Sequence, residues 1–402
     1  MLRKTKVVTT KSVLVANLMW QILGEYCSLY QNISPLPFQL SMSNKEVRVT
    51  NFTTKGRIVS GSSATWMLAH TLACGYFLVS RLLLTKSSIS NSDAIDNLEI
   101  FVNIYFLIFP LCLVGMSVTI AFYPQVAPNI LNRIVEFEGK LEALWDTIPK
   151  KLSPNWMLSM LKFLLRGSIL PVIFIGPGLV YLNLDPLHIL MESNISSMWN
   201  FILNLVRVGM VYFLAAEIVK SAIAFLLVGL IVMQSMSQGV KLLREVLKFK
   251  TLRNAVIFCS LEIRLYRQFQ VWSQYINAAF CNRSVPPLLF CGTCMIIFSL
   301  YGTMRMYGSL PFLVYPLLPA SAVLMLSFQF TLLPQAAKSF EKSLDFVAFV
   351  RKECTVKYER KVARSLLPIG ARCGPFGMIS NKWTVQVANS VSDSTVSLLL
   401  TF

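Results

Sequence analysis

The chain has 402 residues, of which 55% are hydrophobic and 12% aromatic, and its mean hydropathy is +0.59. These values exceed those of ordinary soluble domains and place the chain among proteins that cross a membrane several times. The net charge of +18 would suggest a nucleic-acid partner for a soluble protein, so the distribution of the cations has to decide between nucleic acid and membrane orientation.

The sequence contains few of the residues that form enzyme active sites or metal sites. It contains two histidines, His70 and His188, and nine scattered cysteines. Cys291 and Cys294 lie in an apolar run, where a structural role is expected instead of a zinc or redox site. No cytosolic cluster of carboxylate, histidine or cysteine has catalytic spacing, so we expect no enzymatic activity, no metal and no cofactor. A cleavable signal peptide is not expected, because the first apolar run is short and no small-residue cleavage site follows.

Seven apolar stretches are long enough to cross a bilayer, because a helix of about 20 residues spans a hydrocarbon core of roughly 30 Å. The third contains Pro171 and Pro177, which membrane helices tolerate. The fourth is apolar for 40 positions, 198–237, and could form one long helix or a hairpin. One helix is expected, because Glu217 and Lys220 are i,i+3 partners with no turn-forming residue between them. The predicted spans are about 63–84, 100–123, 163–184, 198–237, 285–304, 310–333 and 380–402.

Two segments between the spans predict helices outside the membrane. Residues 236–284 are charged but keep apolar residues at helical spacing, and a basic helix is expected over 336–350. Trp272, Tyr275 and Phe280 would form a packing surface with that helix, either between subunits or within one. The predicted division is a cytoplasmic N-terminal segment (1–62), transmembrane helices 1–4 (63–235), cytoplasmic anchor helices (236–284), transmembrane helices 5 and 6 (285–333), a cytoplasmic loop with an anchor helix (334–379) and transmembrane helix 7 (380–402).

The positive charges are concentrated in alternate links. The predicted inner segments carry 30 of the 37 Lys and Arg residues, and the outer links 85–98, 184–198 and 305–309 carry two. This positive-inside bias predicts a cytoplasmic N-terminus and an extracellular C-terminus. It also accounts for the net charge without nucleic acid, so the lipid bilayer is the expected partner. Asn194 begins the one Asn-x-Ser/Thr sequon that falls outside and is a candidate glycosylation site.

The last predicted span has a polar side. Its polar residues recur at spacings of four, three, four and four, which places them in one stripe along a helix. A stripe with a carboxylate has to face protein or water, so this helix is the candidate pore lining. Alternatively, Asp393 could hydrogen-bond a neighbouring helix. An adjacent, more apolar line could gate the pore by dewetting, and the sequence leaves open which line faces the axis. The polar stripe is Gln386, Ser390, Asp393, Ser397 and Thr401, and the adjacent line is Val391, Thr395, Leu398 and Phe402.

The C-terminal part of the chain carries a family resemblance. Leu366-Leu367-Pro368 and Gly374-Pro375-Phe376 precede the last helix, in which five residues separate Ser394-Thr395 from Thr401-Phe402. With the length of 402 residues, the inverted topology and the long basic inner loops, this block resembles the arthropod gustatory and odorant receptor superfamily, whose last helix ends in Thr-Tyr, five mostly apolar residues and Gln-Phe. The resemblance implies a ligand-gated, non-selective cation channel that assembles as a homo- or hetero-tetramer around the seventh span, in the plasma membrane of sensory neurons.

The resemblance also implies a pocket for a small-molecule tastant or odorant in the outer halves of spans two to six. Aromatic side chains with few polar groups suit small organic ligands. Because Tyr and Trp also collect at membrane boundaries, helix packing is the alternative role for each of them. The candidate ligand-binding residues are Tyr105, Phe109, Tyr181, Trp199, Tyr212, Tyr301 and Tyr315.

A metabotropic seven-helix receptor and a secondary transporter are the alternative functions. The first conflicts with the predicted cytosolic N-terminus and with the absence of Asp-Arg-Tyr after the third span. The second would predict internal repeats with paired broken helices, and no convincing repeat occurs at the level of spans. Arg207, Glu217 and Lys220 lie within a span, where charges often mark function, but structural pairing is the expected role here. The choice between gustatory and odorant receptor is left open.

Overall fold

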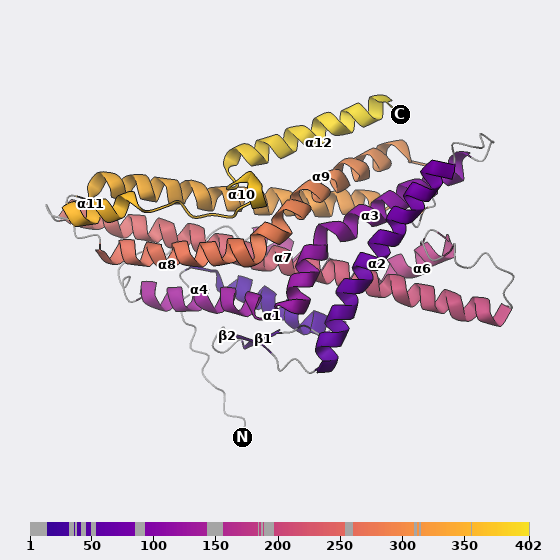
Figure 1. The fold of residues 1–402 in the computed structure, drawn as a ribbon, viewed down its shortest axis with the longest axis horizontal. Coiled ribbons are helices and arrows are strands. Elements are labelled where there is room, and N and C mark those ends of the chain that lie inside the picture. The colour runs from indigo at the N-terminus through magenta and orange to yellow at the C-terminus, as the bar shows by residue number, and fades with distance from the viewer. Residues whose placement is uncertain are drawn as a thin grey trace, which may run out of the picture.

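A computed structural model of the chain shows an elongated bundle of helices (Figure 1). Asn194 and Phe402, two of the predicted site residues, lie outside the part of the chain that it describes. The structure describes residues 14–31, 36, 38–41, 46–49, 54–84, 93–142, 156–183, 185, 188, 197–253, 260–308, 312, 315–354 and 356–401.

The predicted all-α class is confirmed, apart from one short hairpin near the N-terminus. Its strands β1 (Phe38–Ser41) and β2 (Glu46–Val49) pair antiparallel. The helices are α1 (Asn17–Gln31), α2 (Thr54–Leu84), α3 (Asp93–Phe122), α4 (Val126–Glu142), α5 (Trp156–Gly167), α6 (Ile169–Tyr181), α7 (Ser197–Arg253), α8 (Ser260–Ile276), α9 (Asn282–Arg305), α10 (Leu317–Glu353), α11 (Lys357–Arg364) and α12 (Asn381–Thr401). A π-helical turn, Asn277–Cys281, joins α8 to α9.

Four helices in the described part of the chain are long and apolar enough to cross a membrane. They are α3, α7, the continuous helix from α8 through α9, and α10. The chain is therefore a multi-pass membrane protein. The number of seven spans and the orientation stay predictions. The polar stripe of α12 lowers its mean hydropathy, which explains why this 21-residue helix is not among the four.

The long helix α7 confirms the prediction that residues 198–237 form one helix. It has 57 residues, which corresponds to about 86 Å and greatly exceeds a hydrocarbon core of roughly 30 Å. α10 likewise continues for 37 residues through the predicted border at 333. The predicted borders at 235 and 333 thus fall inside continuous helices, so the membrane part and the anchor share the same helices. No Gly or Pro lies between 230 and 238, and Pro334 is accommodated inside α10 without ending it.

The third predicted span, 163–184, is in fact two helices. α5 ends at Gly167 and α6 begins at Ile169, with Ser168 between them. The Ser168 hydroxyl bonds to the Leu165 carbonyl at 2.7 Å and to the Tyr30 hydroxyl of α1 at 2.8 Å. These contacts hold Ser168, at the break between α5 and α6, against the N-terminal helix α1.

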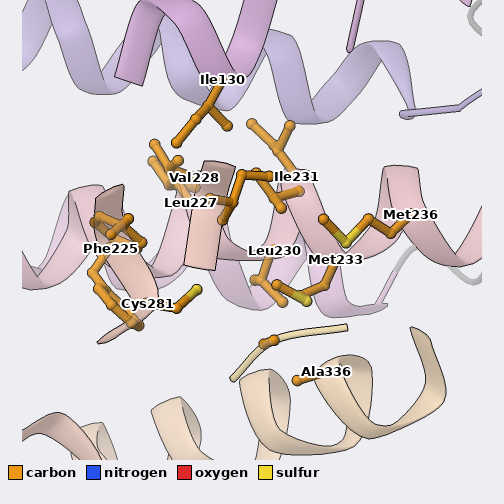
Figure 2. Close-up of a cluster of buried hydrophobic side chains, with 14 of the residues drawn as sticks. Ile130, Phe225, Leu227, Val228, Leu230, Ile231, Met233, Met236, Cys281 and Ala336 are labelled. Atoms are coloured by element: carbon orange, nitrogen blue, oxygen red, sulfur yellow. The ribbon is translucent and has the colours of Figure 1, made fainter. Parts of the chain in front are cut away.

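The main core is built around α7. Figure 2 shows its side chains Val228 and Met233 between Ile130 of α4 and Ala336 of α10. In the anchor, Phe269 of α8 stacks on Phe137 of α4 with ring centroids 4.3 Å apart. Trp272 and Phe280 are also buried, whereas Tyr275 is exposed. Trp272 and Phe280 therefore pack within one chain, which is one of the two roles predicted for this surface.

A smaller core lies around α3, α6, α7 and α10, and we call it the outer cluster. It comprises Phe101, Val102, Leu179, Val180, Val211 and Leu318.

The two ends of the bundle differ. Figure 1 shows α4, α8 and α11 toward one end, and α6 with the start of α7 toward the other. α12 runs from the middle of the bundle toward the end that holds α6. Helices from three of the segments predicted to be cytoplasmic thus lie toward one end, whereas α1, β1 and β2, from the predicted N-terminal cytoplasmic segment, lie near the middle.

Gly239 of α7 offers a test of the anchor packing. A Cβ atom there would lie 2.6 Å from Cζ of Phe269, whose ring is fully buried. Gly239→Ala is expected to lower the free energy of unfolding by about 1–3 kcal/mol, because the stacked ring has little room to move. Gly209→Ala is the matched control on the same helix, since no atom lies within 4 Å of its Cβ position. That control should keep or gain stability through helix propensity. Thermal unfolding in detergent compares the two, and a Gly239→Ala protein as stable as the control contradicts this packing.

Candidate pore helix and ligand pocket

α12 packs on its own subunit through one face. It contacts α9 and α10, and its buried residues are Val391 and Thr395. Trp383, Val387 and Leu398 are half-buried beside them and pack against the main core. The adjacent line of the sequence prediction therefore points into the subunit at Val391 and Thr395 and is partly covered at Leu398.

The polar stripe lies on the open side of α12. The hydroxyls of Ser397 and Thr401 bond to the carbonyls of Asp393 and Ser397, four residues earlier, at 2.8 and 2.7 Å. Such bonds satisfy hydroxyl groups without a partner from another helix. All five predicted stripe residues are exposed in the single chain: Gln386, Ser390, Asp393, Ser397 and Thr401.

The segment before α12 is fastened to the anchor. The side-chain amide of Asn277, in the π-helical turn, donates to the Gly370 carbonyl and accepts from the Arg372 backbone N–H, both at 2.9 Å. Ser343 of α10 accepts from the Ile369 N–H at 2.6 Å, and Tyr266 of α8 donates to the Leu367 carbonyl at 2.9 Å. π-helical turns often mark functional positions, and here the turn supplies the contact. Movement of α8 or α10 is thus transmitted to the start of α12.

Some of the predicted ligand-binding residues meet around the outer cluster. Tyr105, Tyr301 and Tyr315 are partly buried and pack against it. Tyr105 stacks on Phe109 with centroids 6.0 Å apart, and the Tyr315 hydroxyl donates to the Thr303 carbonyl at 3.0 Å. These four aromatic residues come from α3, α9 and the turn before α10.

A group of hydroxyls lies within this aromatic site. The hydroxyls of Ser299 and Ser321 are 3.0 Å apart, and the Tyr105 hydroxyl lies near both. Sequence reasoning missed the two serines, because Ser in an apolar helix is common and gives no signal of its own. The site therefore combines apolar rings with a few buried polar groups, as pockets for small organic molecules do.

The other three predicted ligand-binding residues lie elsewhere. Tyr181 is 81% exposed at the end of α6, and Trp199 and Tyr212 of α7 are 56% and 39% exposed. They are not brought together with Tyr105. Their placement on outer faces agrees with the alternative weighed for them, contact with the membrane boundary.

Arg207 forms a buried ion pair, as expected, but with a partner that the sequence did not indicate. Its guanidinium contacts both carboxylate oxygens of Asp185, which precedes α7, and it also donates to Asn204 at 2.8 Å and Asn183 at 3.2 Å. Arg207 and Asp185 are both almost fully buried. Helical spacing could not reveal this partner, because it lies 22 residues away in a loop. The pair fixes that loop to α7 beside the outer cluster.

The pairing of Glu217 with Lys220 is confirmed. The carboxylate and the ammonium lie 2.5 Å apart and are almost completely buried. Ser117 of α3 donates to Glu217 at 3.0 Å, and Tyr26 of α1 donates to the Lys220 carbonyl at 3.1 Å. This network joins α1, α3 and α7 and keeps the charges out of lipid.

A separate apolar cavity of about 70 Å³ lies deeper in the main core. Val228, Phe280, Met325 and Leu289 are among its lining residues, with Gln329 as a polar member. None of the predicted ligand-binding residues lines it. Among the described residues, no group of three or more His, Cys, Asp or Glu side chains could hold a metal ion.

Comparison with known proteins finds structures with the same fold but no protein with a matching sequence. No family model matches the chain, and no curated protein matches it. The chain has the fold of an insect olfactory receptor. The solved structure of the olfactory receptor OR5 from Machilis hrabei in complex with eugenol superposes with a TM-score of 0.62 at 13% identity. The structure of the same receptor reported without mention of a ligand gives a TM-score of 0.61 at 14% identity. Each covers 96% of this chain and 100% of the other, so the likeness extends over the whole fold.

The Glu217–Lys220 pair can be tested by removing one charge or both. Glu217→Gln leaves the ammonium buried without its counter-charge, so the free energy of unfolding is expected to fall by about 3–5 kcal/mol. The Glu217→Leu, Lys220→Met double variant removes both charges and should recover most of that loss. Thermal unfolding and the yield of folded protein report the effect. A double variant no more stable than Glu217→Gln would show that the pair is not the structural element described here.

Proposed function

We propose that this chain is a chemosensory receptor, gustatory or odorant, that acts as a ligand-gated, non-selective cation channel in the plasma membrane of sensory neurons. The observation that carries the proposal is the exposed polar stripe of α12 within the fold of an insect olfactory receptor. A polar helix face that its own subunit leaves uncovered needs water or other subunits beside it in a membrane. Membership of the arthropod chemoreceptor superfamily is part of the proposal.

The proposed topology has seven spans, a cytosolic N-terminus and an extracellular C-terminus. The charge distribution supports it, with 30 of 37 cations in the inner segments. The gathering of α4, α8 and α11 at one end of the bundle supports a cytosolic anchor (Figure 1). On the outer side, Asn194 is proposed to be glycosylated.

In the proposed tetramer, homomeric or with related receptors, α12 of each subunit faces the central axis. Val391 and Thr395 are held against the subunit's own helices, so the axis receives the polar stripe. Asp393 then forms a ring of carboxylates, which favours cations. Leu398 and Phe402, at the outer end of the adjacent line, are proposed to narrow the pore beside the stripe.

The proposed ligand site is the aromatic site at the outer cluster. Tyr105, Phe109, Tyr301 and Tyr315 would enclose a small organic tastant or odorant, and the serine hydroxyls would orient its polar group. The olfactory receptor solved with eugenol supports this class of ligand for the fold.

Coupling from this site to the pore would follow two helices. α9 carries Tyr301 and α10 begins beside Tyr315, and both helices contact α12. A ligand that binds more tightly to the arrangement in which α12 is displaced from the axis would shift the population toward the open channel.

The carboxylate ring predicts a permeation phenotype. Asp393→Asn keeps the size of the side chain but removes the charge, so cation conductance and relative calcium permeability should fall by roughly twofold or more. Asp345→Asn is the control, since Asp345 is an exposed carboxylate on the anchor. Single-channel recording measures both variants. Unchanged conductance and permeability ratios in Asp393→Asn would refute the ring.

The aromatic site predicts a potency phenotype. Tyr301→Ala and Tyr105→Ala should raise the ligand concentration for half-maximal current by about tenfold, because each removes buried aromatic contact. Tyr181→Ala and Trp199→Ala, on exposed faces, should leave it within about twofold. Dose–response curves with a panel of volatile and water-soluble organic ligands measure the shift. Equal effects in the two groups would place the ligand elsewhere.

A further inference from the structure

Three lysines lie together where α7 and α10 leave their apolar stretches. α7 carries no charged residue from 221 to 240, and Lys241 ends that stretch. α10 carries none from 317 to 337, and Lys338 ends it. The two helices pack against each other, and Lys342 of α10 bridges them by donating to the hydroxyl of Ser237 at 2.9 Å. The charge-free run of α10 leaves Val323 and Phe330 exposed, as a helix in lipid does, so its end at Lys338 corresponds to the inner membrane boundary.

The lysines outnumber the carboxylates that face them. Lys342 is half-buried, and its burial together with the nearby charges of Lys338 and Lys241 lowers its pKa to about 8, while Glu245 opposes this effect. Glu245 itself is 3.6 Å from Lys241. Helix packing thus holds three lysines near Glu245 and near Glu341, which follows Lys338 by three residues on α10, and their mutual repulsion is relieved only in part.

Arg244 and Asp345 flank the group and neutralise each other at 3.1 Å, so they change the local charge little. An added anion with several oxygens would relieve the remaining repulsion.

We propose that Lys241, Lys338 and Lys342 bind the headgroup of an anionic phospholipid of the inner leaflet that carries more than one phosphate. Lys241 and Lys338 are exposed and can reach a headgroup, while Lys342 approaches from the groove between the helices. A lipid fits better than a free phosphate, because the charge-free stretch of α10, in which Val323 and Phe330 are exposed, ends at the site and would lie beside the acyl chains.

The site is placed to regulate α12. Ser343, the residue after Lys342, accepts the hydrogen bond from Ile369 that fastens the segment before α12. A headgroup that draws α10 toward α7 would therefore stabilise this connection. This regulatory role rests on the proposed channel function, whereas binding does not.

Binding is tested with the full-length protein purified in detergent and then placed in lipid nanodiscs. One set of nanodiscs contains phosphatidylcholine alone, and the other contains in addition a phosphatidylinositol bisphosphate. Soluble inositol trisphosphate, which has no acyl chains, tests whether a free phosphate compound binds as well as the lipid. Native mass spectrometry or a fluorescent lipid measures the occupancy of the site. We expect the bisphosphate lipid to bind, and the Lys241→Gln, Lys338→Gln, Lys342→Gln variant to bind it at least about tenfold more weakly.

The control removes the same charge at the far end of the anchor, where Lys352, Lys357 and Lys361 are also exposed. Their replacement by Gln should change the affinity by less than about twofold. Lys342→Arg keeps the charge and should retain binding, which separates loss of the site from loss of the fold.

Equal lipid affinity of the triple variant and the wild type would overturn the proposal. So would binding of inositol trisphosphate as tight as that of the lipid, which would indicate a site for free phosphates. Ligand-evoked current measured with and without the lipid then tests the regulatory role alone, so a failed channel experiment leaves the binding result standing.

Discussion

A hydrocarbon core roughly 30 Å thick can cover only about a third of α7, whose 57 residues extend about 86 Å. The helix must therefore project far beyond the membrane, and the remaining helices are arranged along it. α1, α2, α3, α4, α6, α8 and α10 all pack on it along its length. Its buried charges obey the same constraint: Arg207 is paired with Asp185 and Glu217 with Lys220, because an unpaired charge in this environment is costly.

The shared helices give a physical route between distant parts of the protein. α9 and α10 pass from the outer cluster, where the aromatic rings gather, to the anchor, and each contacts α12 on the way. The backbone segment before α12 is hydrogen-bonded to Asn277 and Ser343 of those same continuous helices. Ligand, membrane and anchor can therefore all act on α12, the proposed pore helix, through rigid elements, and no flexible linker has to transmit the signal.

The sequence carried much of this information, and its gaps have physical reasons. The unbroken α7 was predictable because no turn-forming residue lies between Glu217 and Lys220, and the polar stripe of α12 was visible as a spacing. The break at Ser168 has a local cause in Pro171, which has no N–H to bond the Gly167 carbonyl, but the bond of Ser168 to Tyr30, 138 residues away, was not predictable. Nor could the sequence show that Asp185 meets Arg207, or that Val391 and Thr395 are the packed face of α12. Each of these depends on contact between elements, which periodicity within one element does not encode. The same limit applied to the aromatic residues. Tyr105 and Tyr181 both lie in apolar stretches of the sequence, but Tyr105 is partly buried and Tyr181 is exposed.

The central claim is that the polar stripe of α12 lines a water-filled pore that ligand binding opens. Cysteine accessibility along α12 tests it most directly. Single cysteines at Gln386, Ser390, Asp393 and Ser397 would be compared with cysteines at Val391 and Thr395, in a background in which the exposed Cys294 is serine. The account predicts that a charged, water-soluble thiol reagent reduces the ligand-evoked current at the four stripe positions and leaves it unchanged at the two packed positions. Modification at Val391 and Thr395, with no effect at the stripe, would contradict it.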